Sequence, residues 1–307
     1  MTVFPDRQNE LLKFAPVRSK CLEVAPFHRP ALLKSDYDVD YTDYATTEEL
    51  RAKTPVHEGI SVESVCAVDY VWTPGKTLRS CIPNGVSYDF AIASHVMEHV
   101  PDVLGWAQQI FDVMRPGAVF QLALPDHRGC FDVFRRPTDI SEMLQNWITK
   151  NDRPNVGQIY DFLSKNVVIP DATTEASALF PFGENPKIED FKRNYSDESA
   201  LHFALDHFKK STYMDTHCSV FTPESLVEAF SAANRLGIFN IELGQPVMGA
   251  REFFIAVKKI GEPRIRREEI YREKEKFDRA NGPIGRPIAA ETESPGFWRR
   301  LGGGGRR

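Results

Sequence analysis

The stretch YDFAIASHVMEHV at residues 88–100 begins the segment that decides the fold. Its apolar first half, residues 88–93, predicts a buried strand. A helix follows over residues 102–114, because apolar residues recur there at spacings of three and four. Arg-Pro-Gly at residues 115–117 ends that helix, and VFQLAL at residues 119–124 predicts the next strand. A strand, a helix and a second strand in this order predict a parallel pair in an α/β sheet.

Strand signals continue on the N-terminal side of this stretch. Short runs rich in β-branched and aromatic residues predict three strands, at Lys20–Val24, Val39–Tyr41 and Val68–Trp72. A helix at Thr46–Lys53, which begins with two threonines that can cap it, lies between the second and the third. Strands that alternate with helices favour a parallel sheet with helices on both faces.

The C-terminal side adds a helix and a hairpin. Thr222-Pro223-Glu224 combines an N-cap residue, a proline at the first helical position and an early acidic residue, and Gly237 ends the helix. Phe239–Leu243 and Glu252–Lys258 flank a glycine-containing turn and predict an antiparallel pair. The predicted fold is therefore α/β, a seven-stranded, doubly wound, Rossmann-like sheet.

The predicted sheet is interrupted after its fifth strand. Residues 127–215 carry no strand signal, and we interpret them as a largely helical insertion that caps the sheet and holds the substrate. The core then comprises residues 1–126 and 216–260. Residues 261–307 combine a charged helix with a tail that ends in LGGGGRR and cannot bury enough apolar surface to order.

Composition excludes several classes of protein. The 307 residues are 42% hydrophobic and 26% charged, as in an ordinary globular chain. The net charge of −5 argues against a nucleic-acid partner. The sequence holds no apolar run of about 20 residues, so we expect no integral membrane segment. The N-terminus shows no secretory signal, and the five widely spaced cysteines indicate reduced thiols, so we expect a cytoplasmic location.

Several motifs in the quoted stretch and its flanks occur together in one known family. Glu98-His99 follows the predicted fourth strand, RPGA at residues 115–118 follows the helix, and LALP at residues 122–125 ends the fifth strand. This arrangement resembles the class I S-adenosylmethionine-dependent methyltransferases, which place an EH pair, a KPGG turn and a proline there. LEVAP at residues 22–26 is similar to the E-I-G-x-x-x-x-P first loop of a bacterial subgroup, with alanine in place of the glycine. The resemblance covers residues 20–258.

The resemblance implies S-adenosyl-L-methionine as the cofactor, bound at the carboxyl ends of the strands. We expect its site to include Glu23, Ala25, Asp43, Trp72 and Ser94. Asp43 has two acceptor oxygens that can bind both ribose hydroxyls, and Trp72 can border the adenine ring. An ordinary polar turn at Asp43 and a core position for Trp72 are the alternative interpretations. Ala25 can occupy the place of the loop glycine if its φ is negative.

Two histidines are candidate catalytic bases. His95 and His127 lie at the mouths of the predicted fourth and fifth strands, and the charge of imidazole changes near neutral pH. Either could deprotonate an acceptor hydroxyl, or each could be a structural histidine. The resemblance implies a small-molecule or glycan acceptor, because the subgroup is often linked with glycan and cell-envelope biosynthesis. A methyltransferase-like protein that binds a ligand without catalysis is the alternative, and Ala25 favours it.

His95-Val96-Met97-Glu98-His99 also matches the H-x-x-E-H pattern of a family of zinc peptidases. That pattern needs a long helix, so that both histidines share one helix face. Here a buried strand runs directly into His95, and Pro101 follows. We therefore expect no bound metal, and a zinc hydrolase is the weaker alternative.

Overall fold

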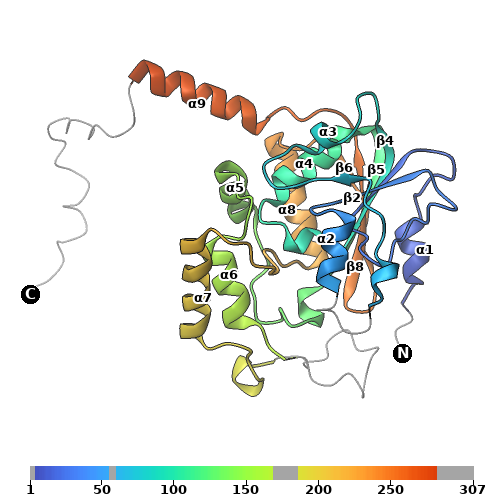
Figure 1. Ribbon diagram of the computed structural model, residues 1–307. Helices are drawn as coiled ribbons and strands as arrows, with labels where there is room; N and C mark the ends of the chain where they lie inside the picture. Colours follow the sequence, from blue (N-terminus) through green and yellow to red (C-terminus); the bar gives the residue numbers. More distant parts are fainter. Residues whose placement is uncertain (1–3, 55–59, 169–185, 282–307) are drawn as a thin grey trace, which may run out of the picture. The chain divides into compact units, whose positions relative to one another are not determined.

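The computed structural model describes residues 4–54, 60–168 and 186–281. The chain divides into two compact units, Met1–Ile265 and Arg266–Arg307. A mixed sheet forms the centre of the first unit (Figure 1). Its strands are β1 (Cys21–Val24), β2 (Val39–Asp43), β3 (Tyr70–Val71), β4 (Tyr88–Ser94), β5 (Met114–Pro125), β6 (Ile241–Leu243), β7 (Val247–Met248) and β8 (Glu252–Lys259).

The strand order is β3-β2-β1-β4-β5-β8-β6, and β7 pairs with β8. Strands β1 to β5 are all parallel, whereas β8 runs antiparallel to both β5 and β6. The α/β sheet and its C-terminal antiparallel pair are as predicted from the sequence. The eighth strand, β7, was not predicted, because two residues inside a turn give no periodic signal.

The sheet carries helices on both faces. The α-helices of the first unit are α1 (Arg7–Leu12), α2 (Thr47–Lys53), α3 (Leu78–Cys81), α4 (Val103–Val113), α5 (Ile140–Thr149), α6 (Val156–Lys165), α7 (Asp197–Lys210) and α8 (Pro223–Leu236). Figure 1 shows α1 beside one face of the sheet and α4 and α8 beside the other. The 3₁₀ turns η3 (Met97–His99) and η4 (His127–Gly129) follow β4 and β5.

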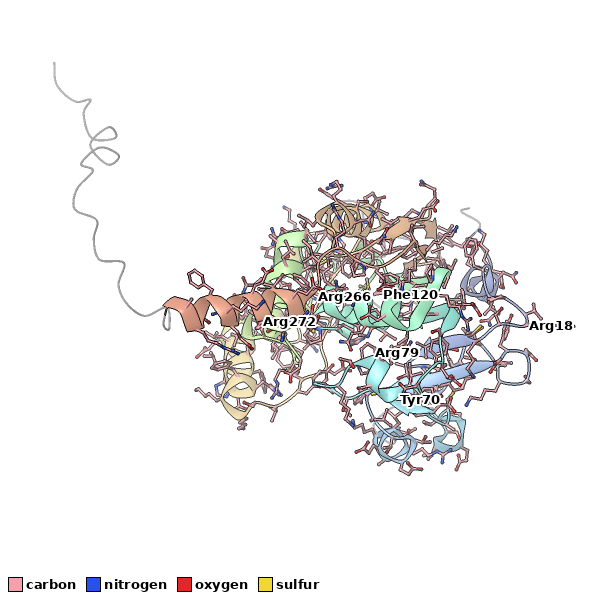
Figure 2. The ribbon with its side chains drawn as sticks, turned by 90° about the horizontal axis from the view of Figure 1, so that it is seen from above. Arg18, Tyr70, Arg79, Phe120, Arg266 and Arg272 are labelled. Atoms are coloured by element: carbon pink, nitrogen blue, oxygen red, sulfur yellow. The ribbon has the colours of Figure 1, made fainter. Side chains whose placement is uncertain are left out.

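Alternation along β5 explains this layering. Ala123 packs in a cluster with Leu11 of α1, and Gln121 donates to the Glu10 carbonyl of α1 at 3.2 Å. Phe120, which is fully buried, points to the other face and contacts Trp106 and Phe111 of α4. Because successive strand residues point to opposite faces, one apolar strand holds both helix layers. Figure 2 shows Phe120 in the interior and Arg18 at the outer end of the loop before β1.

Local capping fixes the helix ends that the sequence predicted. Thr222 accepts a hydrogen bond from the Ser225 backbone, Pro223 is the first residue of α8, and Gly237 ends it with φ of 87°. Thr46, the first of the two candidate caps, forms a capping box with Glu49 at the start of α2. These ends need only local hydrogen bonds, which is why sequence alone locates them.

The described part of residues 127–215 is helical and holds no strand longer than a single bridge. Helices α6 and α7 share a small apolar cluster of Ile159, Leu163, Ala200 and Ala204. The remaining part of the predicted insertion, residues 169–185, lies outside the described residues. Its role as a separate substrate-holding cap stays a prediction.

The second unit contains α9 (Arg267–Asn281). Its charged side chains pair along the helix, Arg279 with Glu275 at 3.4 Å and Lys274 with Asp278 at 2.5 Å. The predicted tail from residue 282 onward lies outside the described residues. Among the helices that the structure describes, none has both the length and the apolar character needed to cross a membrane.

Candidate functional site

The carboxyl ends of β1, β2 and β4 lie at one edge of the sheet. Val24 pairs with Thr42 on one side and with Ala93 on the other, so Asp43 and Ser94 flank the end of β1. The chain crosses from the β1–β3 side of the sheet to the β4–β5 side at this point. Doubly wound sheets bind ligands at such a reversal of strand order, outside the carboxyl ends of the strands.

Glu23 supports the loop after β1 from within. Its carboxylate is buried and accepts the backbone N–H groups of Ala31 at 2.7 Å and Leu32 at 2.9 Å. Burial raises the pKa of Glu23 to about 7, although these two hydrogen bonds oppose the rise. The carboxylate therefore faces the loop backbone, and we assign Glu23 an indirect role in holding that loop.

The loop after β1 adopts a glycine-like backbone without glycine. Ala25 has φ of 51° and Phe27 has φ of 48°, in the left-handed region. The condition under which alanine could replace the loop glycine without strain, a negative φ, is therefore not met. A non-glycine residue in this region costs about 1 kcal/mol or more, so the surrounding contacts must stabilise it. One is the hydrogen bond from the Ala25 N–H to the Thr42 carbonyl at 2.7 Å.

Most described non-glycine residues with a positive φ lie near the edge of the sheet formed by the carboxyl ends of the parallel strands. Among the described non-glycine residues, Lys150 and Ser211 also have positive φ, but each simply ends a helix. The other four lie in the loops at the ends of the central strands: Ala25, Phe27, His95 and Arg251. Strained backbone of this kind concentrates at functional sites, where neighbouring structure holds a loop in one shape.

Asp43 ends β2 and is almost fully buried. Its Oδ1 accepts the Tyr44 N–H at 2.7 Å. Burial raises the pKa of Asp43 to about 6, against the effects of backbone hydrogen bonds from Tyr44 and Ala45 and of the Lys53 charge. A carboxylate has about four acceptor positions, so two remain for a pair of ligand hydroxyls. This carboxylate therefore fits the ribose of a nucleoside-bearing cofactor.

Trp72 lies next to Asp43, since the backbone N–H of Trp72 donates to the backbone carbonyl of Asp43 at 2.7 Å. Its indole stacks on Trp106 of α4, with ring centroids 6.5 Å apart, and its Nε1 donates to the Lys76 carbonyl at 3.1 Å. The ring is thus fixed at the end of β3. Contact with an adenine ring stays a prediction.

Ser94 and His95 end β4 and join a charged cluster. His95 Nε2 lies 2.9 Å from Glu252 Oε2, and Arg7 Nε donates to the same carboxylate at 2.9 Å. Arg7 also donates to Ser94 Oγ at 2.7 Å. Burial raises the pKa of Glu252, but the His95 hydrogen bond and the Arg7 charge outweigh that effect and lower it. This cluster presents a histidine that is oriented by a carboxylate.

A cleft of about 300 Å³ opens beside this cluster. It is lined by residues from the ends of β4 and β5, the start of the predicted insertion, the segment before α8 and the start of β8. These are His95, Glu98, His99, Pro125, Gly129, Cys130, Phe131, His217, Ala250, Arg251 and Glu252. Its volume lies at the small end of the range typical for small-molecule sites.

The two candidate bases differ in position. The side chain of His95 is 43% exposed and lines the cleft. His127 is buried and is not among the lining residues, and its Nδ1 lies 3.4 Å from the Asp132 carbonyl oxygen. Burial lowers the pKa of His127. The structure therefore favours His95 over His127 as the base.

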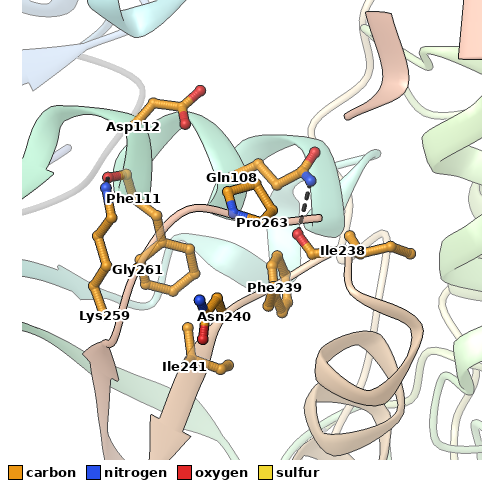
Figure 3. A pocket seen from close by; sticks show the side chains of 10 residues that line it. All are labelled: Gln108, Phe111, Asp112, Ile238, Phe239, Asn240, Ile241, Lys259, Gly261 and Pro263. Carbon is orange, nitrogen blue, oxygen red and sulfur yellow. Dashed lines mark hydrogen bonds between the residues drawn. The ribbon is translucent and has the colours of Figure 1, made fainter. Parts of the chain in front are cut away.

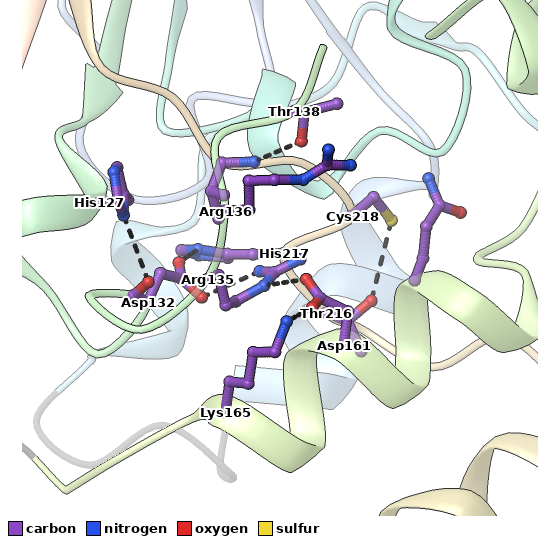
Figure 4. A network of polar contacts seen from close by, with 12 residues as sticks. His127, Asp132, Arg135, Arg136, Thr138, Asp161, Lys165, Thr216, His217 and Cys218 are labelled. Atoms are coloured by element: carbon purple, nitrogen blue, oxygen red, sulfur yellow. Dashed lines mark hydrogen bonds and ion pairs between the residues drawn. The ribbon is translucent and has the colours of Figure 1, made fainter. Parts of the chain in front are cut away.

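A network of polar contacts, partly buried, includes His217 of the cleft wall (Figure 4). Arg135 donates to Asp132 at 2.9 Å and to Asp161 at 2.7 Å, and Lys165 pairs with Asp161 at 2.6 Å. Asp132 also holds His217 Nδ1 at 2.5 Å. Through Asp132 and Arg135, these charged contacts connect His217, which lines the cleft, to Asp161 of α6.

A second, much smaller cavity of about 10 Å³ lies between α4 and the segment around β6 (Figure 3). Lys259 lies at its edge and donates to the Phe111 carbonyl at 2.7 Å and to the Met114 carbonyl at 3.0 Å. A lysine that binds the last carbonyls of α4 stabilises that helix end. The cavity has room for about one water molecule, which is too little for a substrate or cofactor.

Sequence reasoning missed Arg7 and the pairing of His217 with Asp132. Arg7 meets Glu252 across 245 positions, and His217 meets Asp132 across 85. No local pattern carries such contacts. Glu252 begins a predicted strand, and both Glu252 and His217 lie within residues 20–258, which the family resemblance covers; these were the only signals for them.

Known proteins show the following similarities to this chain. The model of a family described as a methyltransferase domain matches residues 37–234. No curated protein is similar enough in sequence to count as a relative.

Among solved structures, an S-adenosylmethionine-dependent methyltransferase from Clostridium acetobutylicum is 8% identical, with 83% of this chain and 91% of that one covered and a TM-score of 0.42. The CurJ carbon methyltransferase is 10% identical, with 81% and 51% covered and a TM-score of 0.38. An O-methyltransferase family protein from Burkholderia thailandensis is 10% identical, with 82% and 54% covered and a TM-score of 0.37. The chain spans about half the length of the last two.

Proposed function

Because this chain belongs to the methyltransferase-domain family, whose methyl donor is S-adenosylmethionine, we propose that it methylates a hydroxyl of a small molecule or glycan. The observation that carries the proposal is the His95–Glu252 pair, which faces a cleft at the carboxyl ends of β4 and β5. The cleft has room for an acceptor of about the size of one sugar.

The residues at the sheet edge fit the donor. Asp43 would accept the ribose hydroxyls, and Trp72 would lie beside the base. The loop at Ala25 and the Ser94 hydroxyl would complete the site. S-adenosylmethionine supplies a methyl group that its positively charged sulfur already activates. The main task of the chain is then to hold and orient the reactants.

His95 would act as the general base. If its Nε2–H donates to Glu252, its Nδ1 carries the lone pair. Nδ1 is 3.6 Å from the nearest Glu98 oxygen, which is beyond hydrogen-bond distance. It is thus available to accept a proton from an acceptor hydroxyl, while Glu252 and Arg7 hold the ring in place.

The test pairs binding with turnover. Calorimetry should show that wild-type protein binds one S-adenosylhomocysteine per chain. With an acceptor from a panel of sugars and small alcohols, His95→Gln should keep that affinity but transfer methyl groups about 100-fold more slowly. His202→Gln, a change at an exposed site on α7, is the matched control. Equal rates for His95→Gln and wild type would refute the assignment of the base.

A protein that binds the cofactor without catalysis remains the second candidate, because Ala25 places a side chain on left-handed backbone in the cofactor loop. Binding of S-adenosylhomocysteine with no turnover of any acceptor would favour it.

A further inference from the structure

Three potential metal ligands meet in the cleft beside His95. They are Glu98 and His99, in the 3₁₀ turn after β4, and His217, in the segment before α8. One ligand atom from each lies within 4.8 Å of the other two. The two segments are tied together, since the Ser219 N–H donates to the Glu98 carbonyl at 3.1 Å and Cys218 Sγ donates to the His99 carbonyl at 3.3 Å.

Glu98 is the unusual member of this group. It is 1% exposed, and neither of its carboxylate oxygens has a hydrogen-bond partner among the described residues. The nearest cationic candidate, His95 Nδ1, is 3.6 Å away. Buried carboxylates are normally hydrogen-bonded, paired or bound to a metal. A buried carboxylate without such a partner suits the role of a metal ligand.

Both histidines are already oriented as metal ligands are. His99 Nδ1 lies 2.8 Å from Asp215 Oδ1, and His217 Nδ1 lies 2.5 Å from Asp132 Oδ2. Each carboxylate favours the tautomer with the proton on Nδ1, which leaves the lone pair on Nε2. This carboxylate–histidine arrangement is the usual outer shell of a metal site. Arg135 in turn holds Asp132.

We propose that Glu98, His99 and His217 bind one divalent transition-metal ion, with Zn²⁺ as the first choice. Two imidazole nitrogens and one carboxylate suit zinc and its neighbours, whereas Mg²⁺ and Ca²⁺ prefer oxygen ligands. Ligand atoms around one tetrahedral zinc ion lie about 3.4 Å apart, so closing around the ion requires side-chain shifts of about 1 Å. Three protein ligands leave one position open to the cleft, where an oxygen of a bound molecule fits.

This site goes beyond the proposed methyl transfer and does not depend on it. It also differs from the H-x-x-E-H zinc site considered in the sequence analysis, in which His95 and His99 would share one helix face. Residues 97–99 form only one 3₁₀ turn, so His95 and His99 do not share a helix face. His217, 118 positions after His99, takes the place of the second histidine. The expectation of no bound metal considered only the local pattern.

The test is a Zn²⁺ titration of the full chain after treatment with a chelator. Wild type should bind one Zn²⁺ per chain, and Mg²⁺ should not compete. Glu98→Gln, which keeps the size of the side chain, should weaken binding by at least tenfold. Asp215→Asn should weaken it by about 10–100-fold through His99, as changes in the outer shell of a metal site do.

Asp206→Asn is the matched control, because Asp206 forms a surface ion pair with Lys210 on α7. It should bind Zn²⁺ as wild type does. The Asp215 side chain is 73% exposed, so its variant keeps the test decisive even if Glu98→Gln does not fold. Failure of wild type to bind Zn²⁺, or equal affinity in wild type and Asp215→Asn, would overturn the site. S-adenosylhomocysteine affinity, measured on the same samples, separates this outcome from failure of the proposed function.

Discussion

Replacing Asp43 should separate stability from cofactor binding. Burial raises the pKa of this carboxyl from 3.8 to about 6, which corresponds to about 3 kcal/mol of destabilisation by the ionised form at neutral pH. Asp43→Asn retains an oxygen for the Tyr44 N–H and removes that charge. We therefore expect this variant to unfold at higher urea concentration than wild type at pH 7.5, with a gain of up to about 3 kcal/mol.

Cofactor binding should change in the opposite direction. A hydrogen bond to a charged group contributes about 1.5–3 kcal/mol, so Asp43→Ala should weaken S-adenosylhomocysteine binding about 10- to 150-fold. Calorimetry of Asp43→Ala and of the exposed control Asp36→Ala measures the difference. If Asp43→Ala binds as tightly as wild type, Asp43 does not hold the ribose. If Asp43→Asn is less stable than wild type, the assigned cost of its charge is wrong.

Three further outcomes are expected. Wild-type affinity for S-adenosylhomocysteine should be constant well above pH 6 and fall below it, by no more than the 10- to 150-fold expected for loss of the charged acceptor, because Asp43, with its pKa of about 6, becomes protonated; an equal fall in Asp43→Asn would contradict this. Ala25→Gly should raise the free energy of unfolding by up to about 1 kcal/mol, since φ of 51° suits glycine, and a loss of stability in urea would count against the strained loop. Tyr160→Ala, on α6 in the predicted cap, should alter acceptor turnover without changing cofactor affinity, and a loss of cofactor binding would place the insertion in the cofactor site.

The parts of this fold that the sequence predicted depend on local physics. Thr222, Pro223 and Gly237 locate α8 through hydrogen bonds and backbone angles within a few residues of each helix end. The apolar runs in β4 and β5 predicted central strands, because both faces of these strands are covered. Such signals need no knowledge of distant residues.

The site was only partly predictable for the same reason. Asp43 and Ser94 could be placed at the sheet edge, since each lies within two residues of the end of a predicted strand. The positive φ of Ala25 could not be predicted from the sequence. Alanine normally avoids the left-handed region, and only tertiary contacts impose it here. His127 looked equivalent to His95 in sequence, and only the packing after β5 buries it outside the cleft.

The most direct test of the account is a calorimetric titration of the wild-type chain with S-adenosylmethionine at pH 7.5, where Asp43 is ionised. Binding of one molecule per chain, competed by S-adenosylhomocysteine, is the predicted result. A folded protein that binds neither compound would contradict the assignment of the sheet edge as a cofactor site.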